Sequence, residues 1–213
     1  MTVQNFTQYS IDQLFTILEN EIDLRFSNAS TDRWNAWAYQ NFNDSQSRGL
    51  DFVTYEAGQH LAPETSVGYV TGPVASSNSN SIVLGAGQSS TQDDAYNGRM
   101  ITLFNGGNEL ETYQIIDYIG ATRTAIINGS LTNTYSSLNS FVIRTISNYK
   151  ADLMNDDHRM GGLLLRHLNK WKQLGSNANG VGAELWCHFL DTGSQSNYGR
   201  WGSREYFNET PAP

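Results

Sequence analysis

The sequence predicts an α/β fold, a partial barrel-like α/β layer, with an inserted all-β module that is a small barrel or a sandwich. Apolar residues recur at helical spacing in residues 10–62 and 146–213, and each segment also contains a strand-like run. Between them the helical period disappears, and short β-rich runs alternate with Gly and Asn turn signals. We therefore expect one discontinuous α/β domain, residues 1–65 and 146–213, interrupted by a β module at residues 66–145.

The first segment reads as helix, helix, strand. Ser10 and Gln13 have the spacing of a capping box, which predicts a helix start. A second helix is expected from about residues 31–32, with Gly49 in a left-handed position at its end. Residues 50–55 then follow as a strand. The expected first helix is based on the apolar residues Ile11, Leu14, Phe15, Leu18, Ile22 and Phe26. The expected strand is based on Leu50, Phe52 and Val53, and it is buried if all three side chains face protein.

The central segment shows short strands separated by turns. The expected strands are residues 82–84, 100–104, 113–116, 124–127 and 141–143. Asn-Gly steps at residues 97–98, 105–106 and 128–129 suit turns with positive φ. The Ser- and Asn-rich residues 76–81 are predicted to form a loop near the entry to this module.

The last segment again shows the pattern of a helix followed by a strand. Residues 156–157 are expected to cap a helix that ends near Gly175, and residues 181–190 to form a strand followed by an aromatic, Gly-containing loop at residues 198–202. The apolar stripe of that helix is Met160, Leu163, Leu164, His167, Leu168 and Trp171. We expect the strands at 50–55 and 181–190 to lie adjacent and parallel.

The composition and charge of the sequence argue against several classes of partner and location. The chain has 213 residues, a net charge of −8 and only 16% charged residues, without a basic stripe, so we expect no nucleic-acid partner. Cys187 is the only cysteine, which excludes an internal disulfide. The N-terminus lacks the pattern of a signal peptide, and no apolar run is long enough to span a bilayer. Synthesis in a host cytoplasm, with no membrane partner, is the expectation.

The most informative stretch is residues 50–61, where an apolar run ends in a carboxylate, a glycine, an amide and an imidazole. α/β proteins build sites at such strand ends. Glu56 is the candidate catalytic residue, with a relic or structural carboxylate as the alternative. Six further residues are candidate ligand contacts: Gln59, His60, Trp186, His188, Tyr198 and Trp201. The alternatives are a satisfied histidine at a strand end and aromatic side chains that pack the loop. His158, His167 and His188 lack metal-site spacing, so we expect neither a metal nor a cofactor.

Residues 55–61, Tyr-Glu-Ala-Gly-Gln-His-Leu, resemble a Tyr-Glu-Gly-Gly-Gln-His-Leu segment in bacterial proteins related to (β/α)-barrel glycoside hydrolases. Residues 157–160, 168–171, 186–189 and 198–202 are similar to motifs that follow it in the same order. The resemblance implies that residues 50–55 and 181–190 correspond to the seventh and eighth barrel strands, and that Glu56 corresponds to the nucleophile.

The sequence also departs from that family. Ala57 replaces the first glycine of the motif, and we expect strands one to six to be missing, because residues 1–10 are too few to form them. The acid/base of such enzymes is an Asn-Glu pair on the fourth strand, whereas the Asn108-Glu109 step of this protein lies at a turn of the β module. A retaining glycosidase needs two carboxyl groups about 5–5.5 Å apart, so we expect the purified protein to hydrolyse no glycoside.

The β module carries its own resemblance. Residues 81–84, 94–101 and 116–123 are similar to a small β module that recurs in bacteriophage tail and virion proteins. This resemblance implies a phage or prophage virion-associated structural or adhesion protein, a tail or surface component located in the virion, with a cell-surface glycan as a candidate ligand. The alternative is a glycoside hydrolase with Glu56 as nucleophile and the acid/base supplied by a partner chain. The expected partners are copies of itself or other virion proteins, because two strands cannot bury the apolar faces of several helices.

Overall fold

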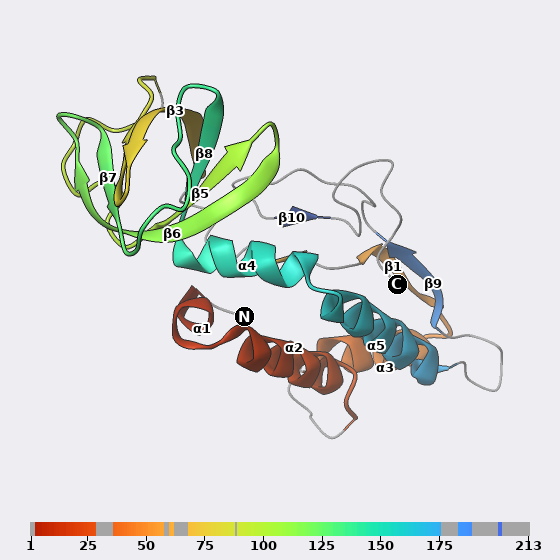
Figure 1. The fold of residues 1–213 in the computed structure, drawn as a ribbon. Helices are drawn as coiled ribbons and strands as arrows, with labels where there is room; N and C mark the ends of the chain where they lie inside the picture. The colour runs from red at the N-terminus through yellow and green to blue at the C-terminus, as the bar shows by residue number, and fades with distance from the viewer. Residues whose placement is uncertain are drawn as a thin grey trace. The chain divides into compact units, whose positions relative to one another are not determined.

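The computed structural model describes residues 3–28, 36–57, 60–61, 68–87, 89–175, 183–188 and 200–201. They divide into two compact units, a barrel unit and a helical unit, with the boundary inside helix α4 (Ile146–Asp156). The elements are labelled in Figure 1.

The barrel unit is a closed antiparallel barrel with strand order β3-β4-β7-β6-β5-β8. Its strands are β3 (Val70–Asn78), β4 (Ser81–Leu84), β5 (Met100–Asn105), β6 (Asn108–Ile119), β7 (Thr124–Ile127) and β8 (Asn139–Arg144). β8 pairs with both β3 and β5, which closes the ring. Thirteen buried residues fill it: Val74, Ile82, Leu84, Tyr96, Ile101, Leu103, Ile115, Tyr118, Ala125, Ile127, Tyr135, Phe141 and Ile143.

The long strand β6 bends so that its first half pairs with β5 and its second half with β7. Two β-bulges accompany the bend, and the unpaired extra residues are Leu110 and Ile116, both of which are exposed. A loop covers the remaining edge of each half. Gly98 N–H donates to the Ile115 carbonyl at 2.8 Å, and Asn128 N–H donates to the Gln114 carbonyl at 2.8 Å. Both edges of β6 are therefore engaged.

Two buried tyrosines hold the loop that precedes β5. The rings of Tyr96 and Tyr118 meet edge to face, 4.6 Å apart. The Tyr118 hydroxyl donates to the Ser90 carbonyl, while Ser90 N–H donates to the Tyr96 hydroxyl, both at 2.7 Å. A Cβ on Gly120 would lie only 2.4 Å from the backbone of this loop, so close approach requires glycine there.

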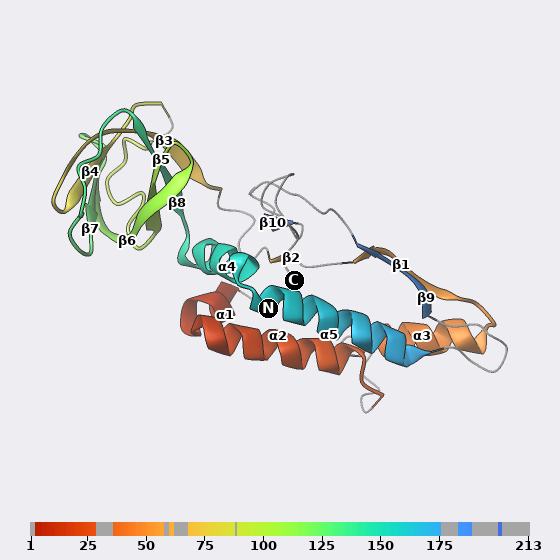
Figure 2. The same ribbon diagram turned by 45° about the vertical axis from the view of Figure 1, so that its right-hand side comes forward.

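The helical unit is built around two parallel helices, α2 (Ile11–Arg25) and α5 (Arg159–Leu174), which lie side by side in Figures 1 and 2. The capping box of Ser10 and Gln13 begins α2, as predicted. Their shared core also takes residues from α1 (Val3–Gln8), α4 and β2 (His60–Leu61). Its buried members are Phe6, Leu14, Phe15, Leu61, Ala151, Met154, Met160 and Leu163. Among the described helices, none combines the length and apolar character needed to cross a bilayer.

Helix α3 (Trp37–Ser47) is followed by Arg48 and then by Gly49, which has φ +69°; Gly49 and Leu50 N–H bond back to the Gln46 and Ser45 carbonyls. The predicted left-handed helix end is thus confirmed. Gly175, with φ +66°, confirms the predicted end of α5. Strands β1 (Phe52–Ala57) and β9 (Ala183–His188) form a two-stranded parallel sheet, so their predicted parallel pairing is confirmed. β2 pairs antiparallel with β10 (Arg200–Trp201).

The predicted fold class is wrong. The largest sheet is the closed antiparallel barrel, and the expected α/β layer is reduced to the β1·β9 pair. The reason is that α2 and the first part of α5 bury their apolar residues in a core that the two helices share, while Trp171 near the end of α5 stacks on Phe52 of β1. The strand at residues 50–55 is not buried on both sides either, because Leu50 is 57% and Val53 is 52% exposed.

The predicted loop at residues 76–81 is also wrong. Residues 76–78 continue β3, residues 79–80 form a tight turn, and Ser81 begins β4. Polar residues are typical of loops, but here the exposed Ser76 and Asn78 and the partly buried Ser77 continue a barrel strand whose residue Val74 is fully buried.

Candidate functional site

The backbone brings most of the candidate site residues together at one end of the β1·β9 sheet. Ala57, next to Glu56, pairs with His188. His60 pairs with Trp201 in the β2·β10 ladder. Only two residues separate β1 from β2, so the Ala57 and His60 backbones are at most about 11 Å apart. With cross-strand neighbours about 5 Å apart, all four strand ends lie within about 20 Å.

The structure describes the backbone of Glu56, His60, Trp186, His188 and Trp201, and Trp186 pairs with Thr54. Gln59 and Tyr198 lie outside the described residues, as do residues 31–35 at the expected start of α3.

Aromatic stacking fixes the start of β1. The Phe52 ring stacks on Trp171 of α5 at 4.8 Å and meets Phe42 of α3 edge to face at 6.2 Å. Leu61 anchors β2, because its side chain is buried in the core of the helical unit. Contacts with the helices thus hold β1 through Phe52 and β2 through Leu61, one on each side of the two-residue connection between the strands.

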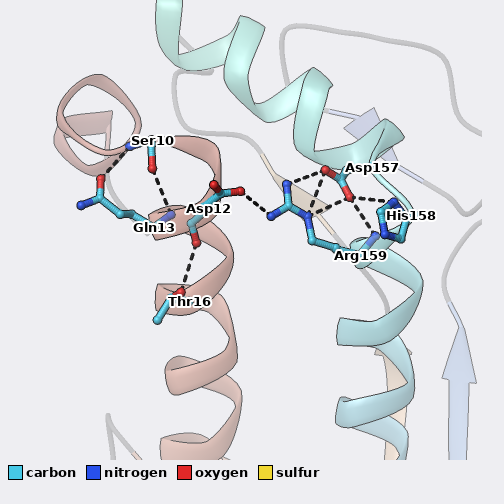
Figure 3. Close-up of polar contacts among 7 residues, drawn as sticks. All are labelled: Ser10, Asp12, Gln13, Thr16, Asp157, His158 and Arg159. Carbon is cyan, nitrogen blue, oxygen red and sulfur yellow. Dashed lines mark hydrogen bonds and ion pairs between the residues drawn. The ribbon is translucent and has the colours of Figure 1, made fainter.

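A polar cluster at the starts of α2 and α5 holds those helices in register (Figure 3). The Asp157 carboxylate accepts the backbone N–H of Arg159 at 2.9 Å and its guanidinium at 2.7–3.1 Å. Asp12 of α2 accepts a bond from the same guanidinium at 2.6 Å, and the guanidinium lies over the Phe15 ring. The hydrogen bonds from Arg159 hold the pKa of Asp157 below its usual range.

The barrel unit contains a second polar cluster that sequence reasoning missed. The Glu111 carboxylate accepts hydrogen bonds from the hydroxyls of Tyr113 (2.6 Å) and Tyr135 (2.5 Å). It also accepts the Thr132 N–H at 2.9 Å and the Asn133 amide at 3.0 Å. Partial burial alone would raise the pKa of Glu111, but these bonds outweigh it and lower the pKa to about 2. Burial and the bond to Glu111 raise the pKa of Tyr135 to about 12.

This cluster ties the loop after β7 to strand β6. The sequence shows only part of this cluster. Glu111 and Tyr113 are alternate residues of one strand, but Tyr135 lies 24 residues from Glu111 in the sequence. Glu109, the acidic half of the Asn-Glu step considered in the sequence, belongs to the same unit and accepts a bond from Thr112 at 3.0 Å. Glu109 and Glu56 belong to different units.

Glu56, His60, His188 and Trp201 occupy backbone positions at or next to the paired strand ends, so the residue types at this end of the unit are one carboxylate, two imidazoles and an indole. These are groups that hydrogen-bond to sugar hydroxyls and stack on sugar rings. No group of three or more His, Cys, Asp or Glu residues within the described ranges is arranged to hold a metal ion. Comparisons with protein-family models, with curated proteins and with solved structures return no match for this protein.

Proposed function

We propose that this protein is a phage virion-associated adhesion protein that binds a cell-surface glycan at the ends of β1 and β9. The observation that carries the proposal is the pairing of Ala57 with His188 and of His60 with Trp201. Candidate residues from two segments more than 120 residues apart in the sequence thereby share one end of the helical unit. The resemblance of residues 81–84, 94–101 and 116–123 to a phage virion module supports the virion assignment.

The chemistry of these residues suits a neutral glycan. Indole rings provide apolar faces for the C–H side of a sugar ring, and Glu56, His60 and His188 can bond to its hydroxyls. The net charge of −8 disfavours polyanionic glycans at low salt. We propose binding rather than hydrolysis because the sequence offers the Asn108-Glu109 step of the β module as its counterpart of the Asn-Glu acid/base pair, and this step departs from the fourth-strand location that the family pattern requires.

A glycan array of neutral and acidic bacterial oligosaccharides tests this function, followed by titration calorimetry on the best ligand. Trp201→Ala should weaken binding about tenfold, the effect of losing one stacked aromatic ring. Trp37→Ala is the matched control, because Trp37 is 39% exposed but lies on α3. No array signal, or equal affinities for the two variants, would contradict the proposal.

Hydrolysis is the second candidate, favoured by the location of Glu56 one residue before the end of β1. Its acid/base would come from a partner chain. An activated aryl glycoside, incubated with the protein and with proteins encoded beside it, tests this reading. Turnover that Glu56→Gln abolishes would establish the hydrolase; turnover that survives the change would exclude Glu56 as nucleophile.

The partners in this proposal are copies of the protein or other virion proteins. Mass spectrometry of purified particles should detect the protein in stoichiometric amounts. Light scattering at micromolar concentration should show an oligomer or, after mixing with neighbouring gene products, a complex. A free monomer that is absent from particles would contradict the virion assignment.

A further inference from the structure

The barrel unit contains three Asn-Gly steps that differ in one respect. Asn97–Gly98, Asn105–Gly106 and Asn128–Gly129 are all exposed, so access to water does not distinguish them. A fourth step, Asn179–Gly180, lies outside the described residues. In all three the glycine has positive φ, between 57° and 144°. What differs is whether the glycine N–H is hydrogen-bonded.

Gly98 and Gly129 both have engaged N–H groups. Gly98 N–H donates to the Ile115 carbonyl at 2.8 Å, and Gly129 N–H donates to the Ile127 carbonyl at 3.1 Å. The side chain of Asn97 is held as well, because its amide donates to Asp94 at 2.6 Å. Deamidation at these steps first requires these bonds to break.

The Asn105–Gly106 step lacks such restraints. Gly106 and Gly107 form the two-residue turn between β5 and β6, with φ +57° and +95°. In the described part of the barrel, neither the Gly106 N–H nor the Asn105 side chain makes a hydrogen bond. A Cβ placed on either glycine would meet nothing within 4 Å, so the turn has open space around it.

We propose that Asn105 is a site of spontaneous deamidation in the folded protein. The backbone nitrogen of Gly106 loses its proton and attacks Cγ of Asn105; a new bond forms between these two atoms, the bond from Cγ to the amide nitrogen Nδ2 breaks, and ammonia leaves. A water molecule from solvent then opens the cyclic imide at either carbonyl. One opening gives aspartate, and the other gives isoaspartate, in which the backbone runs through the former side chain.

Asn105 is the last residue of β5, and it pairs with Asn108 of β6 and with Asn139 of β8. Attack therefore requires only the end of the hairpin to fray, which costs little at a strand terminus. Both products place a negative charge beside the Asn139–Phe104 contact. Isoaspartate also lengthens the backbone at a residue that three strands share, so it should loosen this end of the barrel.

Peptide mapping by mass spectrometry tests the proposal on the full-length protein, incubated for several weeks at mildly alkaline pH. Each conversion exchanges an NH group for an oxygen atom, and isoaspartyl methyltransferase labels the isoaspartate product. Asn105 should convert about fivefold faster than Asn97 or Asn128, the rate effect of one hydrogen bond that need not be broken. Equal rates at the three steps would overturn the proposal.

The same experiment in concentrated urea separates structure from sequence. Unfolding removes the bonds to Gly98 and Gly129, so the three rates should converge. A preference for Asn105 that persists unchanged in urea would show that local sequence, not the fold, selects it. Asn105→Gln should abolish conversion in its peptide while the other two peptides convert as before; a product there in spite of the change would also contradict the mechanism.

Discussion

The barrel unit and the helical unit treat their strand edges in opposite ways. In the barrel, every strand pairs with two neighbouring strands. At the bend of β6, where its pairing changes from β5 to β7, loop residues hydrogen-bond to the backbone of β6. In the helical unit, β1 pairs only with β9 in the described residues, and β2 only with β10. Parallel sheets normally have several strands and helices on both faces, and two-stranded units are marginal.

The difference shows where each unit gains its stability. The barrel combines a closed apolar core with hydrogen bonds from buried tyrosines. The helical unit depends on the contact between α2 and α5, whose two ends carry ion pairs: Arg159 with Asp12, and Arg166 and Lys170 with Asp23. We therefore expect the two units to respond differently to core truncation, acid and salt.

Truncation of the barrel core should have the largest effect. Ile143 is fully buried, and its strand pairs with both β3 and β5. Ile143→Ala should lower the free energy of unfolding by about 2–5 kcal/mol, because a closed barrel cannot collapse onto the cavity. Leu163→Ala, in the core of the helical unit, should lie near the lower end of that range because two helices can move together.

Tryptophan and tyrosine are distributed unequally between the two units. All five tryptophans, Trp34, Trp37, Trp171, Trp186 and Trp201, lie outside residues 64–149, which contain six of the eleven tyrosines, including the buried Tyr96, Tyr118 and Tyr135. Ile143→Ala should shift the urea transition of the tyrosine circular dichroism band and leave that of tryptophan fluorescence in place. Equal shifts of both signals would mean that the units unfold as one.

Loss of the Glu111 cluster should have an intermediate effect. Glu111→Gln removes the charge that four donors contact, and we expect a loss of about 1–3 kcal/mol. Glu109→Gln is the control, since Glu109 is exposed and accepts one bond from Thr112. The tyrosine band in urea titrations measures both variants.

Acid should reveal the same cluster. The pKa of Glu111 is lowered from its ordinary value of 4.5 to about 2 in the folded state. Its contribution is therefore complete above pH 4.5 and is lost as the pH falls toward 2. The stability difference between the wild type and Glu111→Gln should shrink over that interval; a difference that stays constant would show that the carboxylate charge is not what holds the loop.

Local signals predicted much of each unit. The capping box at Ser10, the glycine positions Gly49 and Gly175, and the five β-rich runs of the central segment each depend on residues close together in sequence. The parallel pairing of β1 with β9 followed from a general rule for successive strands.

The rest depended on contacts between distant segments. Val74 is buried because β3 closes the barrel on β8, and nothing in the Ser- and Asn-rich sequence after it reveals that closure. The α/β prediction failed because periodicity identifies an apolar helix face but not its partner: α2 and α5 share one core although more than 130 residues separate them. Tyr135 reaches Glu111 in the same non-local way.

The smallest expected losses of stability come from removing either of the two carboxylates that bind Arg159. A cation in the first turn of α5 is disfavoured by the helix dipole, and both Asp157 and Asp12 offset it. Asp157 is 19% exposed and also accepts the Arg159 backbone N–H, whereas Asp12 is 84% exposed and accepts one bond. Asp157→Ala should cost about 0.5–1.5 kcal/mol, the net contribution of a hydrogen bond, and Asp12→Ala at most about 1 kcal/mol.

Salt distinguishes the two contributions, because screening weakens an exposed ion pair but not a backbone hydrogen bond. Tryptophan fluorescence, which includes Trp171 on α5, follows the urea transition of both variants at low and high ionic strength. The Asp12→Ala effect should nearly vanish at high salt, while most of the Asp157→Ala effect should persist. If both effects vanish together, the helix start is held by charge alone, and the helical unit is more salt-sensitive than its hydrogen bonds indicate.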